Sequence, residues 1–140
     1  VKRRDIQPGQ MKLHQFTYET AVSTEHFLTF EIDDALLGFC RLSLPNGPPL
    51  MDELANAAMI REVHVYGQSL EIGQSNADDA QHRGLGRQLI ERAAEIAADA
   101  GFGTLAVISS VGTRAYYRRL NFTDGVLYQH RALASIQTPQ

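Results

Sequence analysis

Apolar residues in the first half of the chain recur in patterns that predict β-strands. Residues 11–18 and 26–32 are rich in β-forming side chains, and "HFLTFEI" and "ALLGFCRLSL" flank Asp33 and Asp34 in the manner of a hairpin. The run "PNGPP" predicts a turn and "MDELANAA" a short helical turn. Strict alternation in "MIREVHVYG" predicts a strand that ends at Gly67. Its two faces would carry Ile60, Glu62, His64 and Tyr66 on one side and Met59, Arg61, Val63 and Val65 on the other.

The second half predicts helix, strand, helix and strand in that order. A helix is expected over about 84–100, with Gly101 as its C-cap, because apolar residues recur at helical spacing at Leu85, Leu89, Ile90, Ala93, Ile96 and Ala97. "TLAVIS" is continuously apolar, as expected of a strand buried on both faces. Thr113 then fits an N-cap, Asn121 fits a left-handed helix end, and "GVLYQHRAL" predicts the last strand.

Composition favours one soluble globular domain, and the order of its predicted strands and helices indicates the α/β class. The chain has 140 residues, of which 44% are hydrophobic and 21% charged, and its net charge of −3 argues against a protein that coats nucleic acid. With Cys40 as its one cysteine, the chain can form neither an internal disulfide nor a cysteine-held metal site, which suits the cytoplasm. Cys40 itself is expected in the core. We expect no metal site, no membrane span and no signal peptide. Residues 1–10 are interpreted as a linker remnant, and residues 11–140 as the domain.

The glycine pair in "QHRGLG" predicts an anion site. If the helix begins there, Gly84 and Gly86 lie in its first turn, where unpaired N–H groups and the helix dipole attract a diphosphate. Glycine allows the diphosphate to approach the backbone, and Gln81, Arg83 and Arg87 can donate at the rim. The spacing is that of neither a dinucleotide loop nor a P-loop.

The pattern Q-x-x-G-x-G before a long helix resembles the motif of the Gcn5-related N-acetyltransferases (GNAT). Three strings in order, "IREVHVYG", "QHRGLGRQLIERAAEIA" and "LAVISSVGTRAYYRRLNF", are similar to the C-terminal acetyltransferase domain of Elongator catalytic subunits. The resemblance is strong over about 58–130 and looser over "FLTFEIDDALLGFCRLSLP". Ser110, Ala115 and Asn121 depart from the residues usual in that family. The resemblance implies a mixed, mostly antiparallel sheet with splayed central strands and flanking helices.

The same resemblance implies an acetyl-CoA site. The backbone of Glu62, Val63, His64 and Val65 would hold the pantetheine arm and the thioester carbonyl, and Leu85, Gly86 and Arg87 would contact the diphosphate. Tyr116 and Tyr117 would face the thioester sulfur, with Tyr117 the closer coenzyme contact. A phenol stays protonated at neutral pH and can protonate a departing thiolate.

Each candidate residue also has a structural interpretation. Glu62 can be a general base or a salt-bridge partner, and His64 can be a substrate-side acid or base or a hydrogen-bonded structural residue. Of the adjacent tyrosines, one at most can face the cleft, because neighbouring helical residues point about 100° apart. The arginines at 114, 118 and 119 can contact phosphate or RNA, or form a solvated helix face.

The family resemblance further implies a role in tRNA modification. Acetyl-CoA would supply carbon for a carboxymethyl group on the wobble uridine. The radical step would need an S-adenosylmethionine domain with an iron–sulfur cluster, which is absent from this chain. The tRNA would then be bound through a full-length protein that carries both domains. Two alternatives stay open: a free-standing N-acetyltransferase that acts on an amine or lysine, and a non-catalytic coenzyme-A-binding module.

Overall fold

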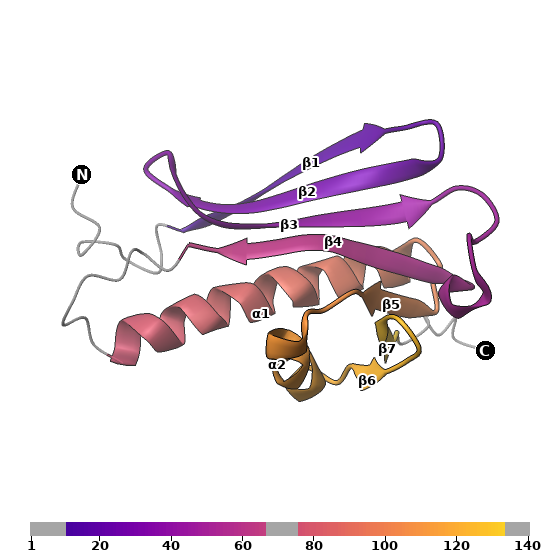
Figure 1. Cartoon of the computed structure of the whole chain (residues 1–140). Helices are drawn as coiled ribbons and strands as arrows, with labels where there is room; N and C mark the ends of the chain where they lie inside the picture. The colour runs from indigo at the N-terminus through magenta and orange to yellow at the C-terminus, as the bar shows by residue number, and fades with distance from the viewer. Residues whose placement is uncertain (1–10, 67–75, 134–140) are drawn as a thin grey trace, which may run out of the picture.

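The computed structural model describes residues 11–66 and 76–133, a seven-stranded sheet with two helices on one face (Figure 1). The strand order is β1-β2-β3-β4-β5-β7-β6. The predicted linker and the predicted strand end at Gly67 lie outside the described residues. In chain order the elements are β1 Lys12–Glu19, β2 Ser23–Ile32, β3 Ala35–Pro45, the 3-10 helix η3 Asp52–Leu54, β4 Ala57–Val65, α1 Asn76–Asp99, β5 Thr104–Val107, the 3-10 helix η4 Val111–Thr113, α2 Arg114–Arg119, β6 Thr123–Asp124 and β7 Gln129–Ala132.

Strands β1 to β4 form an antiparallel meander, and the predicted hairpin between β2 and β3 is confirmed. Asp33 and Asp34 form its turn with φ of 48° and 66°. Two left-handed residues give a turn the twist of the flanking strands, and aspartate tolerates that conformation. Of the described strand pairs only β4 and β5 run parallel, and α1 provides the crossover between them. The α/β class and the mostly antiparallel sheet are therefore confirmed.

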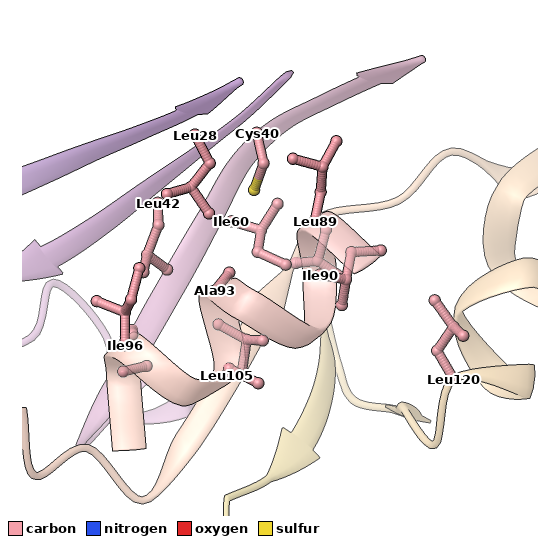
Figure 2. Close-up of a cluster of buried hydrophobic side chains, with 14 of the residues drawn as sticks. Leu28, Cys40, Leu42, Ile60, Leu89, Ile90, Ala93, Ile96, Leu105 and Leu120 are labelled. Atoms are coloured by element: carbon pink, nitrogen blue, oxygen red, sulfur yellow. The ribbon is translucent and has the colours of Figure 1, made fainter. Parts of the chain in front are cut away.

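Helix α1 packs its predicted apolar stripe against the sheet. All six stripe residues are at most 8% exposed, and Leu89, Ile90 and Ala93 are fully covered. They meet Leu28, Leu42 and Ile60 from the sheet in one cluster (Figure 2), and Leu120 joins it from the end of α2. Burial of a leucine of this size contributes about 1.5–3 kcal/mol. The cluster therefore fixes α1 and α2 on the same face of the sheet.

The ends of the later elements differ in part from the prediction. Gly101 adopts φ of +94° and Asn121 φ of +74°, so both predicted helix exits are confirmed. Thr113 precedes α2, but its hydroxyl donates to the Ser110 carbonyl at 3.1 Å and caps no helical N–H group. Strand β5 ends at Val107, before the predicted residue 109. The last strand expected in "GVLYQHRAL" is confirmed as β7 over Gln129–Ala132, while residues 125–128 form the turn that joins it to β6.

A β-bulge at Arg61 overturns the predicted faces of β4. Arg41 of β3 pairs with Glu62, while the next residue of β3, Leu42, pairs with Ile60, so Arg61 is an extra residue without a partner. A bulge reverses the alternation of side chains beyond it. Ile60 consequently joins Val63 and Val65 on the α1 face, and not Glu62 and His64 as strict alternation predicts.

Candidate active site

The sheet opens where β5 ends and its neighbour β4 continues. Their parallel pairing runs from Ala57 opposite Thr104 to Ile60 opposite Val107, and there β5 ends. Strand β4 continues to Val65 and pairs with β3 on its other edge only. The backbone of Glu62–Val65 therefore has no strand partner on the β5 side among the described residues. Such an edge offers N–H and C=O groups to an extended ligand. This is the predicted splay, and it begins directly after the bulge.

Gly84 and Gly86 lie inside α1, and not in its first turn as predicted. The helix begins at Asn76, eight residues before Gly84. In an α-helix the N–H of residue i bonds the carbonyl of residue i−4, so the N–H groups at 84 and 86 are used within α1. The first-turn prediction is therefore wrong for this structure. A diphosphate can use these groups only if the helix is shortened to the glycine pair.

The space around the two glycines differs. A Cβ on Gly84 would meet no atom of the described residues within 4 Å, whereas a Cβ on Gly86 would lie 2.7 Å from the hydroxyl oxygen of Tyr116 and 3.5 Å from Cγ2 of Val65. Gly86 thus lets Tyr116 and the end of β4 approach α1 closely. Leu85 is buried and Arg87 exposed, while the side chains of Gln81 and Arg83 lie outside the described part of the chain.

The two tyrosines of α2 occupy different environments. Tyr116 is half-buried with its hydroxyl over Gly86, and burial raises its pKa. Tyr117 is 8% exposed and packs edge-on against Tyr116 and Phe122, with ring centroids 5.3 and 5.4 Å away. Burial raises the pKa of Tyr117 to about 12, and the neighbouring Tyr116 and Cys40 add to the rise. Both phenols are therefore protonated at neutral pH. Tyr117 belongs to the same buried cluster as Cys40, whose strand partner is Val63 at the splay.

Glu62 is tied into an ion-pair network on the sheet face away from α1. Arg41 donates to its Oε2 from Nε at 3.2 Å and from Nη2 at 3.1 Å, and also reaches the buried Glu25 at 3.4 Å. Burial disfavours the charged form of Glu25, but hydrogen bonds from Ser23 and Ser43 and the Arg41 charge outweigh burial and lower its pKa. The salt-bridge interpretation of Glu62 is confirmed. Its carboxylate is half exposed, so a second role is compatible with the pair.

His64 lies on the same outer face, directly opposite Phe39 in the β3–β4 ladder. The two rings stack at 5.7 Å with planes 9° apart, and the ring of Tyr66 is 5.3 Å from His64. The imidazole is exposed and close to Glu62 along the strand. The structure therefore groups Glu62 and His64 on one side of the sheet, while Tyr116 and Tyr117 approach the splay from the other.

The sequence patterns do not single out the residues that hold the site in place. Arg41 is the partner of Glu62, and a lone charge within an apolar strand was the signal for it. Gln129 of β7 is 3% exposed and bonds the segment that leads into α2. Of the three arginines near α2, Arg118 pairs with Asp124 at 2.6 Å, whereas Arg114 and Arg119 are exposed.

Two predicted absences can be compared with the described residues. No described helix has the length and apolarity to cross a bilayer. Within residues 11–66 and 76–133, no group of three or more metal-ligating side chains converges.

A parallel strand pair that splays apart and is joined by a glycine-bearing crossover helix is typical of an acetyltransferase fold. The chain belongs to the acetyltransferase (GNAT) family, whose model matches residues 3–122. A GNAT acetyltransferase from Brucella melitensis, solved in complex with acetyl-CoA, shares this fold with a TM-score of 0.52 and 22% identity, over 82% of this chain and 62% of that one.

Within that family the chain is similar to Elongator proteins. It is 38% identical over 126 residues to a tRNA uridine(34) acetyltransferase of Dehalococcoides mccartyi, which covers 86% of this chain and 28% of the relative. The human Elongator complex protein 3 is 36% identical over 84% of this chain and 22% of that protein. The structure of the archaeal Methanocaldococcus infernus Elp3 superimposes with a TM-score of 0.76 at 32% identity, over 91% of this chain and 31% of that one. The predicted Elongator resemblance is confirmed. The chain spans less than a third of the length of these relatives.

Proposed function

We propose that this chain is the acetyl-CoA-binding acetyltransferase domain of an Elongator-type enzyme that modifies the wobble uridine of tRNA. The observation that carries the proposal is the splay, where the edge of Glu62–Val65 lacks a strand partner on the β5 side among the described residues. The pantetheine arm of coenzyme A is an extended chain with two amides, and it can bond this edge as a strand would. The name of the Dehalococcoides relative supports tRNA as the substrate.

The residues present fit acetyl-CoA in two of three respects. The open edge of β4 suits the pantetheine, and the empty space at Gly84 leaves room for a diphosphate. The backbone N–H groups near Gly86 do not fit as they stand, because α1 extends to Asn76. The proposal therefore requires the first turns of α1 to unwind when the coenzyme binds. The exposed Arg87 would then pair with the diphosphate as a rim cation, as Gln81 and Arg83 are also proposed to do.

Acetyl-CoA supplies a thioester carbonyl that is open to nucleophilic attack. In our proposal the protonated Tyr117 phenol donates a hydrogen bond or a proton to the departing thiolate. Tyr116 positions the coenzyme beside Gly86. Glu62 and His64 line the outer, acceptor side of the splay, where a base or a polar contact is needed. The bulge at Arg61 is what turns these two side chains to that side.

The first experiment is calorimetry of the full chain with acetyl-CoA, followed by assay of thiol release with and without tRNA. We expect binding, slow release alone and faster release with tRNA. Tyr117→Phe should keep the fold and acetyl-CoA binding but lower kcat, by about 10²–10⁴-fold if it acts as a general acid. Tyr116→Phe is the matched control and should change affinity more than kcat. Absence of acetyl-CoA binding would refute the proposal.

The radical half of the reaction belongs to another domain in our proposal. An S-adenosylmethionine domain with an iron–sulfur cluster would lie in the same polypeptide or a partner, and the protein would work in the cytoplasm. This chain should therefore bind acetyl-CoA but leave the uridine of tRNA unmodified when assayed alone. Mass spectrometry of tRNA nucleosides tests this, and carboxymethylation by the 140 residues alone would contradict it. Acetylation of an added amine, without any effect of tRNA, would favour a free-standing N-acetyltransferase.

A further inference from the structure

Gln129 is a buried amide with every polar atom engaged. It lies at the start of β7, opposite Val107, the last residue of β5, and is 3% exposed. Its Oε1 accepts a hydrogen bond from the Ser109 hydroxyl. Its Nε2 donates to the carbonyl of Arg114 at 3.2 Å and to Oδ1 of Asp124 at 3.0 Å. A rotated amide would place its oxygen against two acceptors, so these contacts fix one orientation.

These bonds join the two ends of one segment. Ser109 lies just beyond β5, where the sheet splays, and Arg114 is the first residue of α2. Between them the segment has its own turn, in which Ser110 accepts from the backbone of Thr113 at 3.0 Å. Gln129 thus spans the segment from the neighbouring strand and fixes where α2 starts relative to β5. Tyr116 and Tyr117 follow directly in α2.

We infer that Gln129 is a positioning residue for the coenzyme slot, the opening between Glu62–Val65 of β4 and the end of β5 in which acetyl-CoA is proposed to bind. This inference rests on the proposed function. Through Ser109, Gln129 positions the segment after β5 that faces β4 across the splay. Through Arg114, it positions the tyrosine pair. The Tyr116 hydroxyl reaches Gly86 only if α2 starts at its present place. Loss of the amide would remove the acceptor of the partly buried Ser109 hydroxyl and one donor to the Arg114 carbonyl, and so break both links between β7 and this segment. The segment would then sample other positions.

The test uses Gln129→Met, which keeps the length of the side chain and removes all three hydrogen bonds. We expect the Kd of the full chain for acetyl-CoA to rise about tenfold, the change that corresponds to the net loss of one or two hydrogen bonds. Amide hydrogen exchange of residues 109–114 should accelerate without coenzyme, while that of β1 to β3 stays unchanged. Arg118→Gln is the matched control, because it removes the ion pair with Asp124 and leaves the Gln129 bonds in place.

A second pair of variants separates positioning from a loss of stability. Gln129→Glu sets a carboxylate against that of Asp124 and should weaken acetyl-CoA binding at least as much as Gln129→Met. Adding Asp124→Asn supplies a donor to Glu at 129 and removes the repulsion, but the Arg114 carbonyl still lacks its donor, so the double variant should bind acetyl-CoA more tightly than Gln129→Glu and more weakly than Asp124→Asn alone. Unchanged affinity and unchanged exchange in Gln129→Met would overturn the inference, as would a double variant that regains the full affinity of Asp124→Asn. A different result separates the two proposals. If the wild-type chain binds no acetyl-CoA, the proposed function fails, and with it the role of Gln129 toward the coenzyme. Faster exchange of residues 109–114 in Gln129→Met would still show that Gln129 holds this segment in place.

Discussion

Replacement of Gly86 by alanine gives the sharpest test of the contact between α1 and α2. The new Cβ would lie 2.7 Å from the hydroxyl oxygen of Tyr116 but 3.8 Å from its Cζ. The first distance is a clash and the second is an ordinary contact. Removal of the hydroxyl alone, in Tyr116→Phe, should therefore remove the obstacle to a methyl group at position 86.

The two effects of the methyl group have opposite signs. Alanine in place of glycine inside a helix stabilises a protein by about 0.5–1 kcal/mol. Overpacking costs about 1–3 kcal/mol, and here it displaces a half-buried ring that also contacts Tyr117. Gly86→Ala should therefore lower the free energy of unfolding by about 0.5–2 kcal/mol in the wild-type background. With Phe at position 116 it should raise it by about 0.5–1 kcal/mol.

Urea unfolding of the wild type, both single variants and the double variant measures this as a double-mutant cycle. We expect a coupling of about 1–3 kcal/mol between the two positions. A coupling below about 0.5 kcal/mol would show that Gly86 and Tyr116 do not touch, since independent sites are additive within that limit. It would refute both the placement of Tyr116 over Gly86 and its proposed role in the slot.

Three further outcomes follow from other contacts. Gly84→Ala should raise the free energy of unfolding by about 0.5–1 kcal/mol, because its methyl group would meet no described atom. The same variant should bind acetyl-CoA more weakly in calorimetry, because a more stable helix opposes the unwinding of α1 that the proposed function requires. Leu89→Ala, in the core, should lose about 2–5 kcal/mol in urea, and Leu50→Ala, 93% exposed, under about 0.5 kcal/mol. Hydrogen bonding to His130 lowers the pKa of Glu53 from 4.5 to about 2, so its stabilisation, complete above 4.5, disappears as the pH falls through 2. Thermal melts at pH 7 should therefore separate Glu53→Gln from wild type, and melts near pH 2 should not.

The parts of the fold that follow a regular period could be predicted from the sequence. The stripe from Leu85 to Ala97 is buried as its spacing requires, and the aspartate pair makes the expected hairpin. Helix exits at Gly101 and Asn121 were predictable, because each residue has a specific backbone preference. These features depend on neighbours within a few positions, so a single sequence contains the information.

What could not be predicted depends on contacts between distant segments. The bulge at Arg61 inserts one residue into a pattern of period two, and only the pairing with β3 reveals it. The start of α1 was placed at the glycines, although "SNADD" just before them has the capping and acidic residues of a helix N-terminus. The amide of Gln129 bonds residues 15 and 20 positions away, and no local pattern marks such a residue.

The bulge at Arg61 makes the faces of β4 depend on how one residue pairs. Between Ile60 and Val65 the strand changes which side chains face α1, and one supernumerary residue does this. If Arg61 joined the ladder as an ordinary residue, alternation from Ile60 would turn Glu62 and His64 toward the core and Val63 and Val65 to the outer face. Deletion of Arg61 would instead place Glu62 directly after Ile60, and because the two already pair with consecutive residues of β3, both faces would stay as they are. Position 61 should therefore tolerate substitution and single-residue deletion alike. The side chains on the outer face are set by the presence of the bulge, and not by the residue that forms it.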